Sequence, residues 1–282
     1  MEEIRIPKAL KISLLVIIII FIILMYLRFI STSGLKVKEY KIVNSNITEN
    51  YHGLKIVQFS DIHYKSTIDY KDLEEVINKI NYIKPDIVVF TGDIFDKHIN
   101  YNETDIKNIT NLFKKIEVSY KKYAISGNHD NIEMWKSVIN NSDFINLNDN
   151  YELIYMNEQQ PILISGISSG TSNVNDKLLN VNKYLFSDEA NQIYSILLMH
   201  EPDNIKYTSD FDLVLAGHSH NGQVKLPYIG AIFTPNGSKK YYDEYYKVNK
   251  SDLYISGGLG SSILNLRFFN KPSINLYRIT NK

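Results

Sequence analysis

The sequence predicts an α/β fold in which two packed sheets are flanked by helices. Three observations lead to this prediction. From Leu54 onward, short apolar runs alternate with amphipathic stretches, the second half of the chain is richer in strand-like runs than in helical ones, and five strand-like runs end in polar residues. Short apolar runs are typical of buried strands, whereas apolar residues three or four positions apart are typical of helices.

The first half alternates between the two element types. Strands are predicted over 54–59, 87–90 and 122–125, and helices over 70–83, 104–116 and 132–139. Asp69 stands where a residue capping the first of these helices is expected, and Pro85 marks its end. This alternation predicts strands that are covered by helices.

The second half contains mainly strands. They are predicted over 162–165, 194–199, 213–215, 253–256 and 274–279. The Asn-rich stretches 140–150 and 168–182 are predicted to be surface loops, because they combine small polar residues with few periodic apolar ones.

The N-terminus is different in character. Residues 12–27 are apolar except for Ser13 and Tyr26, and a run of this kind is close to the length of about 17–25 residues that spans a bilayer. It has no polar face that a soluble helix would present to water. We therefore predict a membrane anchor over 1–32, with a cleaved signal sequence as the alternative, a linker over 33–52 and a folded domain over 53–282. Basic residues flank the run on both sides, so their charge leaves the orientation open.

Composition excludes several classes of function. Lysine plus arginine and aspartate plus glutamate each total 31, so the net charge is zero, which argues against binding to nucleic acid. The chain has no cysteine, which excludes disulfides, thiol nucleophiles and thiolate metal sites. Any metal ion would therefore be bound by nitrogen and oxygen.

Five strand-like runs end in residues that can bind metals. They are Phe59-Ser60-Asp61-Ile62-His63, Phe90-Thr91-Gly92-Asp93, Ser126-Gly127-Asn128-His129-Asp130, Leu198-Met199-His200 and Ala216-Gly217-His218-Ser219-His220. Each motif alone is weak, because a Gly-Asp turn or a lone histidine is common. In open α/β sheets, however, ligands gather beyond the carboxyl ends of the strands. The repetition therefore predicts one shared site.

In this order, the five motifs resemble the signature of the calcineurin-like metallophosphoesterase superfamily, which reads Asp-x-His, Gly-Asp, Gly-Asn-His-Asp/Glu, His and Gly-His-x-His. The similarity extends from about Lys55 to Arg278 and implies a four-layer α/β/β/α sandwich. The Arg-Gly pair that follows the Gly-Asp motif in protein Ser/Thr phosphatases is missing here. The run from Gly217 to Pro227 resembles the bacterial, membrane-associated YkuE-like branch instead.

The resemblance implies two divalent metal ions and a role for each residue. Asp61, His63 and His220 would bind one ion, Asn128, His200 and His218 the other, and Asp93 would bridge both. Nitrogen and oxygen ligands of this mixture suit manganese, iron or zinc, with manganese our first expectation. A hydroxide between the metals would attack phosphorus, and two catalytic residues would assist: His129 at the leaving group, with Asp130 orienting its imidazole.

The function implied is that of a metal-dependent phosphoesterase acting on phosphomonoesters or phosphodiesters. It would be a single-pass protein of the cell membrane with its catalytic domain outside the cytoplasm, and its partners would be the membrane and a phosphate-ester substrate. One alternative is a pyrophosphatase acting on a lipid diphosphate of the UDP-diacylglucosamine type. Another is a catalytically silent module that only binds metal. The oligomeric state stays open.

Three further features have two interpretations each. The glycines at 257, 258 and 260 form either a tight turn or a loop lining the substrate mouth. Arg267 either binds phosphate or is paired within the fold. The tyrosines at 241, 242, 245 and 246 form either a rim near lipid headgroups or a packed strand face.

Overall fold

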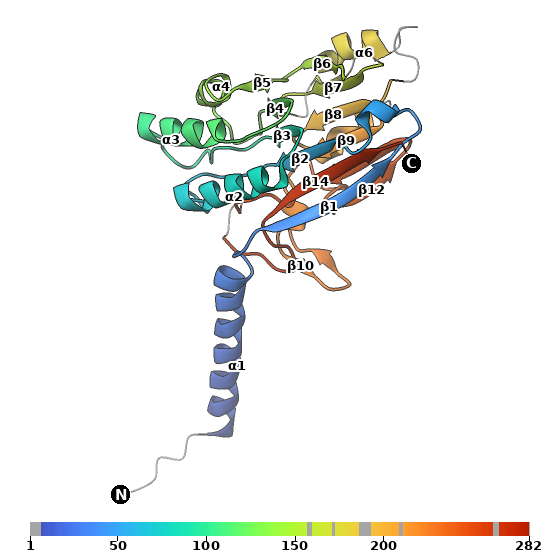
Figure 1. Ribbon diagram of the computed structural model, residues 1–282. Coiled ribbons are helices and arrows are strands. Elements are labelled where there is room, and N and C mark those ends of the chain that lie inside the picture. The colour runs from blue at the N-terminus through green and yellow to red at the C-terminus, as the bar shows by residue number, and fades with distance from the viewer. Residues whose placement is uncertain are drawn as a thin grey trace, which may run out of the picture.

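The computed structural model describes residues 7–156, 160–170, 173–185, 193–208, 211–261 and 265–281. It consists of a folded domain and an N-terminal helix that projects away from that domain (Figure 1). Residues 1–6 of the predicted anchor lie outside the described residues.

One six-stranded sheet carries the N-terminal half of the domain and the C-terminal strand. Its order is β1-β14-β2-β3-β4-β5. Strands β2 to β5 are mutually parallel, whereas β14 is antiparallel to β2 and parallel to β1. The bounds are β1 Lys36–Val43, β14 Ser273–Thr280, β2 Lys55–Phe59, β3 Ile87–Thr91, β4 Lys121–Ile125 and β5 Phe144–Asn146.

Three helices cover the outer face of this sheet: α2 (Tyr70–Ile83), α3 (Glu103–Lys114) and α4 (Ile132–Asn140). The predicted helix over 70–83 is confirmed. A capping box begins it, in which the side chain of Asp69 accepts a hydrogen bond from the backbone of Asp72, 2.9 Å away. A left-handed residue, Lys84, ends it just before Pro85.

The second six-stranded sheet has the order β12-β13-β9-β8-β7-β6. Two short helices, α5 (Val174–Lys177) and α6 (Leu179–Leu185), pack with the 3-10 helix Pro202–Tyr207 on its outer face. The bounds of the strands are β12 Tyr245–Val248, β13 Ser251–Ile255, β9 Leu213–Ala216, β8 Ser195–Met199, β7 Ile162–Gly166 and β6 Asn150–Ile154.

The main core lies between the two sheets. Side chains alternate along each strand, so Ile56 and Val89 point toward Ile196 and Leu215 of the other sheet, whereas their neighbours point toward the helices. All four side chains are fully buried. The predicted four-layer α/β/β/α sandwich is confirmed.

Two predictions about irregular segments differ from the structure. The predicted linker contains β1, which pairs along its whole length with β14. Its charged residues hide the strand pattern because β1 is an edge strand with one neighbour, and charges are common on such edges. The stretch 168–182, predicted as a surface loop, contains α5 and the start of α6, and 140–150 contains β5. These elements are too short for their periodicity to be recognised.

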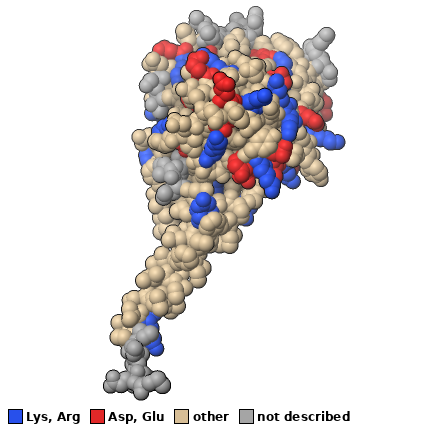
Figure 2. All heavy atoms as spheres, turned by 90° about the vertical axis from the view of Figure 1, so that its left-hand side faces the viewer, with Lys and Arg blue, Asp and Glu red and all other residues tan. Residues whose placement is uncertain are grey.

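The projecting helix consists of α1 (Lys8–Met25) and a π-helical end, η1 (Tyr26–Ile30). Together they form one segment of 23 residues, whose most apolar stretch of 18 residues has a mean hydropathy of 3.0, and the segment is long and apolar enough to cross a membrane. At about 1.5 Å per residue it would measure about 35 Å, against a hydrocarbon thickness of about 30 Å. Figure 2 shows the helix as a stem below a charged domain, with basic side chains only at its two ends.

A buried polar network joins the two sheets at their catalytic edge. The side-chain amide of Gln58 donates to the hydroxyl of Thr91 and to the carbonyl of Ala216, both at 2.9 Å. Its oxygen accepts from the hydroxyl of Tyr277 at 2.7 Å. Because Ala216 belongs to the second sheet, Gln58 links the sheets directly.

We expect Gln58→Leu to lower the free energy of unfolding by about 1–3 kcal/mol, because the buried hydroxyls of Tyr277 and Thr91 lose their shared partner. Urea unfolding of the full chain in detergent measures this. Asn111→Leu, at an exposed position on α3, is the control and should change stability by less than about 0.5 kcal/mol. Equal stability of the two variants would contradict the role of the network.

Candidate metal centre

The seven predicted metal ligands come together at one edge of the sandwich. Each lies just beyond the carboxyl end of a strand, namely β2, β3, β4, β8 or β9. The two aspartates and four histidines are buried, whereas Asn128 is exposed at the mouth of the site. Parallel strands place their carboxyl ends at one edge, which explains the convergence.

One group of ligands consists of Asp61, His63 and His220, whose ligand atoms all lie within 4.8 Å of one another. The Nε2 atoms of His63 and His220 are 3.3 Å apart. Nε2 of His220 is 3.6 Å from Oδ1 of Asp61.

The second group consists of Asp93, His200 and His218, again within 4.8 Å. Nε2 of His200 lies 3.2 Å from Oδ2 of Asp93 and 3.1 Å from Oδ1 of Asn128. Asn128 therefore extends this group toward the solvent.

Asp93 lies between the two groups. Its Oδ2 atom is 3.2 Å from Nε2 of His200 and 3.8 Å from Nε2 of His63. The other oxygen accepts a hydrogen bond from the backbone of His129 at 2.8 Å. One carboxylate oxygen thus faces both groups, which is the placement that a bridging ligand requires.

Backbone carbonyls determine which nitrogen each imidazole presents to the centre. Nδ1 of His200 donates to the carbonyl of Thr91 at 2.8 Å, and Nδ1 of His220 donates to that of Gly260 at 3.1 Å. Nε2 of His218 donates to the carbonyl of Asn236 at 2.7 Å. Because a carbonyl only accepts, the opposite nitrogen of each ring carries the lone pair.

The protonation states fit a cation-binding site. Burial lowers the pKa of His63 to about 4 and also lowers the pKa values of His218 and His220, so these rings are neutral at pH 7. Neutral imidazoles and carboxylates are the forms that bind metals. The two Nε2 atoms of His63 and His220, which face each other at 3.3 Å, can share either a proton or a cation. The donor set therefore fits divalent ions.

Asp93 and His200 are coupled electrostatically. Burial acts to lower the pKa of His200, but the nearby carboxylates, Asp93 first among them, together outweigh burial and raise that pKa above its ordinary value. Burial conversely acts to raise the pKa of Asp93, and the neighbouring imidazoles, His200 first among them, together outweigh burial and hold that pKa low. Burial raises the pKa of Asp61 to about 7. These buried carboxylates need positive partners, which a metal ion supplies while displacing the proton.

The ligands sit on strained backbone. Asp61, His63, Asp93, His218 and His220 all have φ between 47° and 66°, a region that costs non-glycine residues about 1–2 kcal/mol each. Strain of this kind clusters at functional sites. Gly92, with φ of 96°, has no room for a side chain, because a Cβ atom there would lie 2.6 Å from Nδ1 of His200.

Among the described residues, the carboxylate of Asp130 forms no hydrogen bond or ion pair with an imidazole, so these contacts do not support its predicted role of orienting His129. Its Oδ1 accepts from the backbone of Ile94 and Phe95 at 2.8 and 3.1 Å. Its Oδ2 accepts from the backbone of Asp93 and Gly127 at 3.0 and 2.8 Å. Both oxygens are occupied by amides, so Asp130 holds the loop that presents Asp93.

Asp96 is a residue of the site that the sequence predictions missed. Its Oδ1 lies 3.8 Å from Nδ1 of His129, and its Oδ2 lies 3.8 Å from Nδ1 of His63. Both ring nitrogens are buried and have no hydrogen-bond partner among the described residues. The available signal was its position three residues after Asp93 in the same loop.

The glycine loop and Arg267 belong to the scaffold. Arg267 is fully buried, and its guanidinium donates to the carbonyls of Gly257, Gly258 and Gly260. The carbonyl of Gly260 also accepts from His220, so this loop orients a ligand. The interpretation of Arg267 as a residue paired within the fold is confirmed. Among the tyrosines, Tyr241 and Tyr246 pack with their rings 5.1 Å apart.

An open cleft of about 810 Å³ leads to the centre. Besides the ligands, His129, Asp96 and the cationic residues Lys97 and Lys239 line it. Cations at the mouth suit an anionic group such as phosphate.

We expect Asp130→Asn to lower the free energy of unfolding by about 1–3 kcal/mol, because the new amide group would face buried backbone N–H groups. Thermal and urea unfolding of the full chain measure this. Asp143→Asn is the matched control, because the side chain of Asp143 is 79% exposed. Unchanged stability of Asp130→Asn would contradict the loop-holding role.

Comparisons with known proteins agree with this geometry. The family model described as calcineurin-like phosphoesterase matches residues 54–222. The metallophosphoesterase YkuE of Bacillus subtilis is 33% identical over 262 residues, covering 90% of this chain and 88% of that protein.

Two relatives with named activities are more distant. The UDP-2,3-diacylglucosamine pyrophosphatase LpxG of Chlamydia muridarum is 23% identical, with 80% of this chain and 84% of LpxG covered. The phosphodiesterase YaeI of Escherichia coli is also 23% identical, with 82% and 84% covered. From the family match and the similarity to YkuE, the chain belongs to the calcineurin-like phosphoesterase family, in its bacterial YkuE-like branch.

Proposed function

We propose that this protein is a dinuclear metal-dependent phosphoesterase that hydrolyses phosphomonoesters or phosphodiesters at the membrane. The observation that carries the proposal is the position of Asp93, whose Oδ2 atom faces His63 of one ligand group and His200 of the other. Buried carboxylates shared between two groups of imidazoles are typical of two-metal sites.

Each of the two ligand groups would hold one metal ion. Asp61, His63 and His220 would hold one, Asn128, His200 and His218 the other, and Asp93 both. The nitrogen and oxygen donors favour manganese, with iron or zinc as alternatives. When bound, such ions activate water and neutralise the charge that develops on phosphorus.

The chain's own residues would bind and orient the substrate. Lys97 and Lys239 line the cleft and would contact phosphoryl oxygens. His129 lines the same cleft, and its backbone is fixed by Asp93. Its imidazole would donate a hydrogen bond to the leaving-group oxygen, with Asp96 on the far side of the ring to orient it.

We further propose that residues 1–32 anchor the protein in the cell membrane and that the catalytic domain, predicted over 53–282 and extended by β1 from Lys36, lies outside the cytoplasm. The apolar segment Lys8–Ile30 supports the anchor, because it is long enough to span a bilayer and none of its most apolar stretch is buried. The orientation rests on the resemblance to the YkuE-like branch.

A second candidate function is hydrolysis of a lipid diphosphate, as in LpxG. The similarity to LpxG and the apolar helix favour it. A catalytically silent module is disfavoured, because both ligand groups and His129 are intact.

We expect the full chain in detergent, supplied with manganese, to hydrolyse an aryl phosphate ester. Asp93→Asn and His129→Ala should each lower kcat by about 10²-fold or more, through loss of a shared ligand and of leaving-group assistance respectively. His52→Ala is the control, since His52 contacts Thr280 and Asn281 away from the cleft. Full activity in Asp93→Asn would refute the two-metal mechanism.

We also expect elemental analysis to find about two manganese ions per wild-type chain after dialysis against the metal. Chelation should remove both the ions and the activity, and added manganese should restore them. His220→Ala should retain about one ion, because only one ligand group loses a member. A wild-type chain that binds a single ion would contradict the assignment.

A further inference from the structure

Exposed apolar side chains gather on the domain beside the projecting helix. They lie in the segment 225–233, which we call the apolar hairpin and which contains β10 (Lys225–Leu226) and β11 (Gly230–Ala231). Tyr228 is fully exposed, and Ile229 and Ile232 are 74% and 63% exposed. Phe269, on the adjacent segment, is 70% exposed. Contiguous apolar surface of this kind marks an interaction site.

Hydrogen bonds connect the apolar hairpin to the end of the helix. The backbone of Arg267 donates to the carbonyl of Leu27 at 3.2 Å. The next residue, Phe268, donates to Gln223 and accepts from Lys225, both at 3.1 Å. Leu27 belongs to the apolar segment, so this chain of bonds holds the hairpin near the level at which the helix leaves the hydrocarbon.

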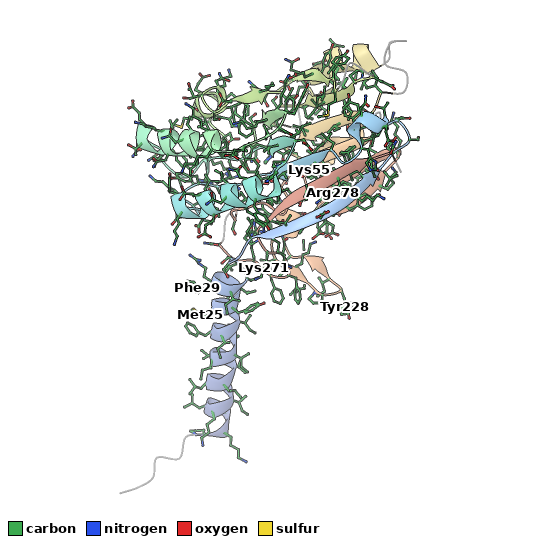
Figure 3. The ribbon with its side chains drawn as sticks, viewed as in Figure 1. Met25, Phe29, Lys55, Tyr228, Lys271 and Arg278 are labelled. Carbon is green, nitrogen blue, oxygen red and sulfur yellow. The ribbon has the colours of Figure 1, made fainter. Side chains whose placement is uncertain are left out.

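Figure 3 shows the same arrangement. Tyr228 lies at the tip of the hairpin on the side of the domain from which the helix projects, at about the height of Met25 and Phe29, and Lys271 lies above these two residues, where the helix meets the domain. Tyrosine, phenylalanine and lysine are side chains that favour the boundary between lipid and water.

The sheet topology places the metal centre toward this side as well. β1 begins with Lys36, six residues after the helix ends, and Lys36 pairs with Ser273 at the start of β14. Because β14 is antiparallel to β2, its start lies near the carboxyl end of β2, where Asp61 emerges. The chain therefore enters the domain at the edge that carries the ligands.

The apolar hairpin runs directly into the cleft. Phe233 is 58% exposed and lines the cleft, with Nζ of Lys239 lying 5.1 Å from the centre of its ring. Three residues further on, the carbonyl of Asn236 accepts from His218. One short segment thus connects the exposed apolar surface with a metal ligand.

We propose that the apolar hairpin and Phe269 dock into the headgroup layer of the bilayer that the helix spans, and so hold the mouth of the cleft against the lipid surface. The partner is the lipid bilayer itself. Apolar and aromatic side chains flanked by lysines are suited to this layer. A helix that spans the bilayer would bring the apolar hairpin to the headgroup layer. The inference rests on the proposed membrane anchor, but not on the proposed hydrolytic activity.

The absence of cysteine from the chain makes the test specific. Ile229→Cys provides a single site for an environment-sensitive fluorophore in the full chain. The protein is placed, one copy per disc, in phosphatidylcholine and phosphatidylglycerol nanodiscs with or without nitroxide-bearing lipids. Tyr155→Cys is the control, because Tyr155 is 52% exposed and follows β6 on the side of the domain away from the helix (Figure 1).

We expect the label at position 229 to emit at shorter wavelength and to be quenched at least about twofold by the nitroxide lipids, whereas the label at 155 is not. Equal, water-like behaviour of the two labels would overturn the proposal. Shielding that occurs only in discs holding two copies would also overturn it, in favour of contact between copies.

A second measurement separates docking from local folding. The label is placed at Phe269→Cys, with and without the changes Tyr228→Asp and Ile229→Asp. Charges are costly in the lipid interface, so lipid quenching at 269 should fall at least about twofold while the thermal unfolding midpoint is unchanged. Unchanged quenching would contradict the proposal. Aryl phosphate hydrolysis, measured alongside, tests the proposed function independently.

Discussion

The structure depends on the burial of two carboxylates among four imidazoles at the edge between two sheets. Burial of a charge is costly unless a partner of opposite charge is present, and the groups around Asp61 and Asp93 are mainly imidazoles and backbone amides, with the hydroxyl of Ser60 donating to Asp61. Cations bound between the two ligand groups would satisfy this requirement. The same requirement accounts for the left-handed backbone at five ligands, because the loops must turn sharply to direct every side chain inward.

The surroundings of the centre are built mainly from backbone groups. Carbonyls of Thr91, Asn236 and Gly260 orient three imidazoles, and four amides hold the carboxylate of Asp130. Arg267 in turn holds the glycine loop that carries Gly260. Fixed dipoles of this kind keep the ligands in place without side chains that would compete for the metal. Geometry of the centre is therefore sensitive to residues that never touch it.

The side of the domain from which the apolar helix projects follows from the path of the chain. β1 follows the apolar helix and begins at the end of the sheet where the predicted ligands lie. Backbone hydrogen bonds of Arg267 and Phe268 connect Leu27 with the apolar hairpin. A cleft held beside a bilayer would meet phosphate esters of lipid headgroups at high local concentration. Such a placement would be compatible with a lipid-linked substrate of the kind named for LpxG.

The sequence by itself determined the fold class and the convergence of the seven predicted ligands, because strand periodicity and the polar residues after each strand are local patterns, and parallel strands deliver their ends to one edge. Only the tertiary structure decided the contacts of Asp130, Asp96 and Arg267, since their partners are set by which loops pack together. It likewise decided that 36–43 is a strand, because an edge strand is recognised by its neighbour rather than by its own pattern. The apolar hairpin could be recognised as an interaction surface only from its position beside the helix. Its exposure and its proximity to the helix are properties of packing, which no local sequence pattern encodes.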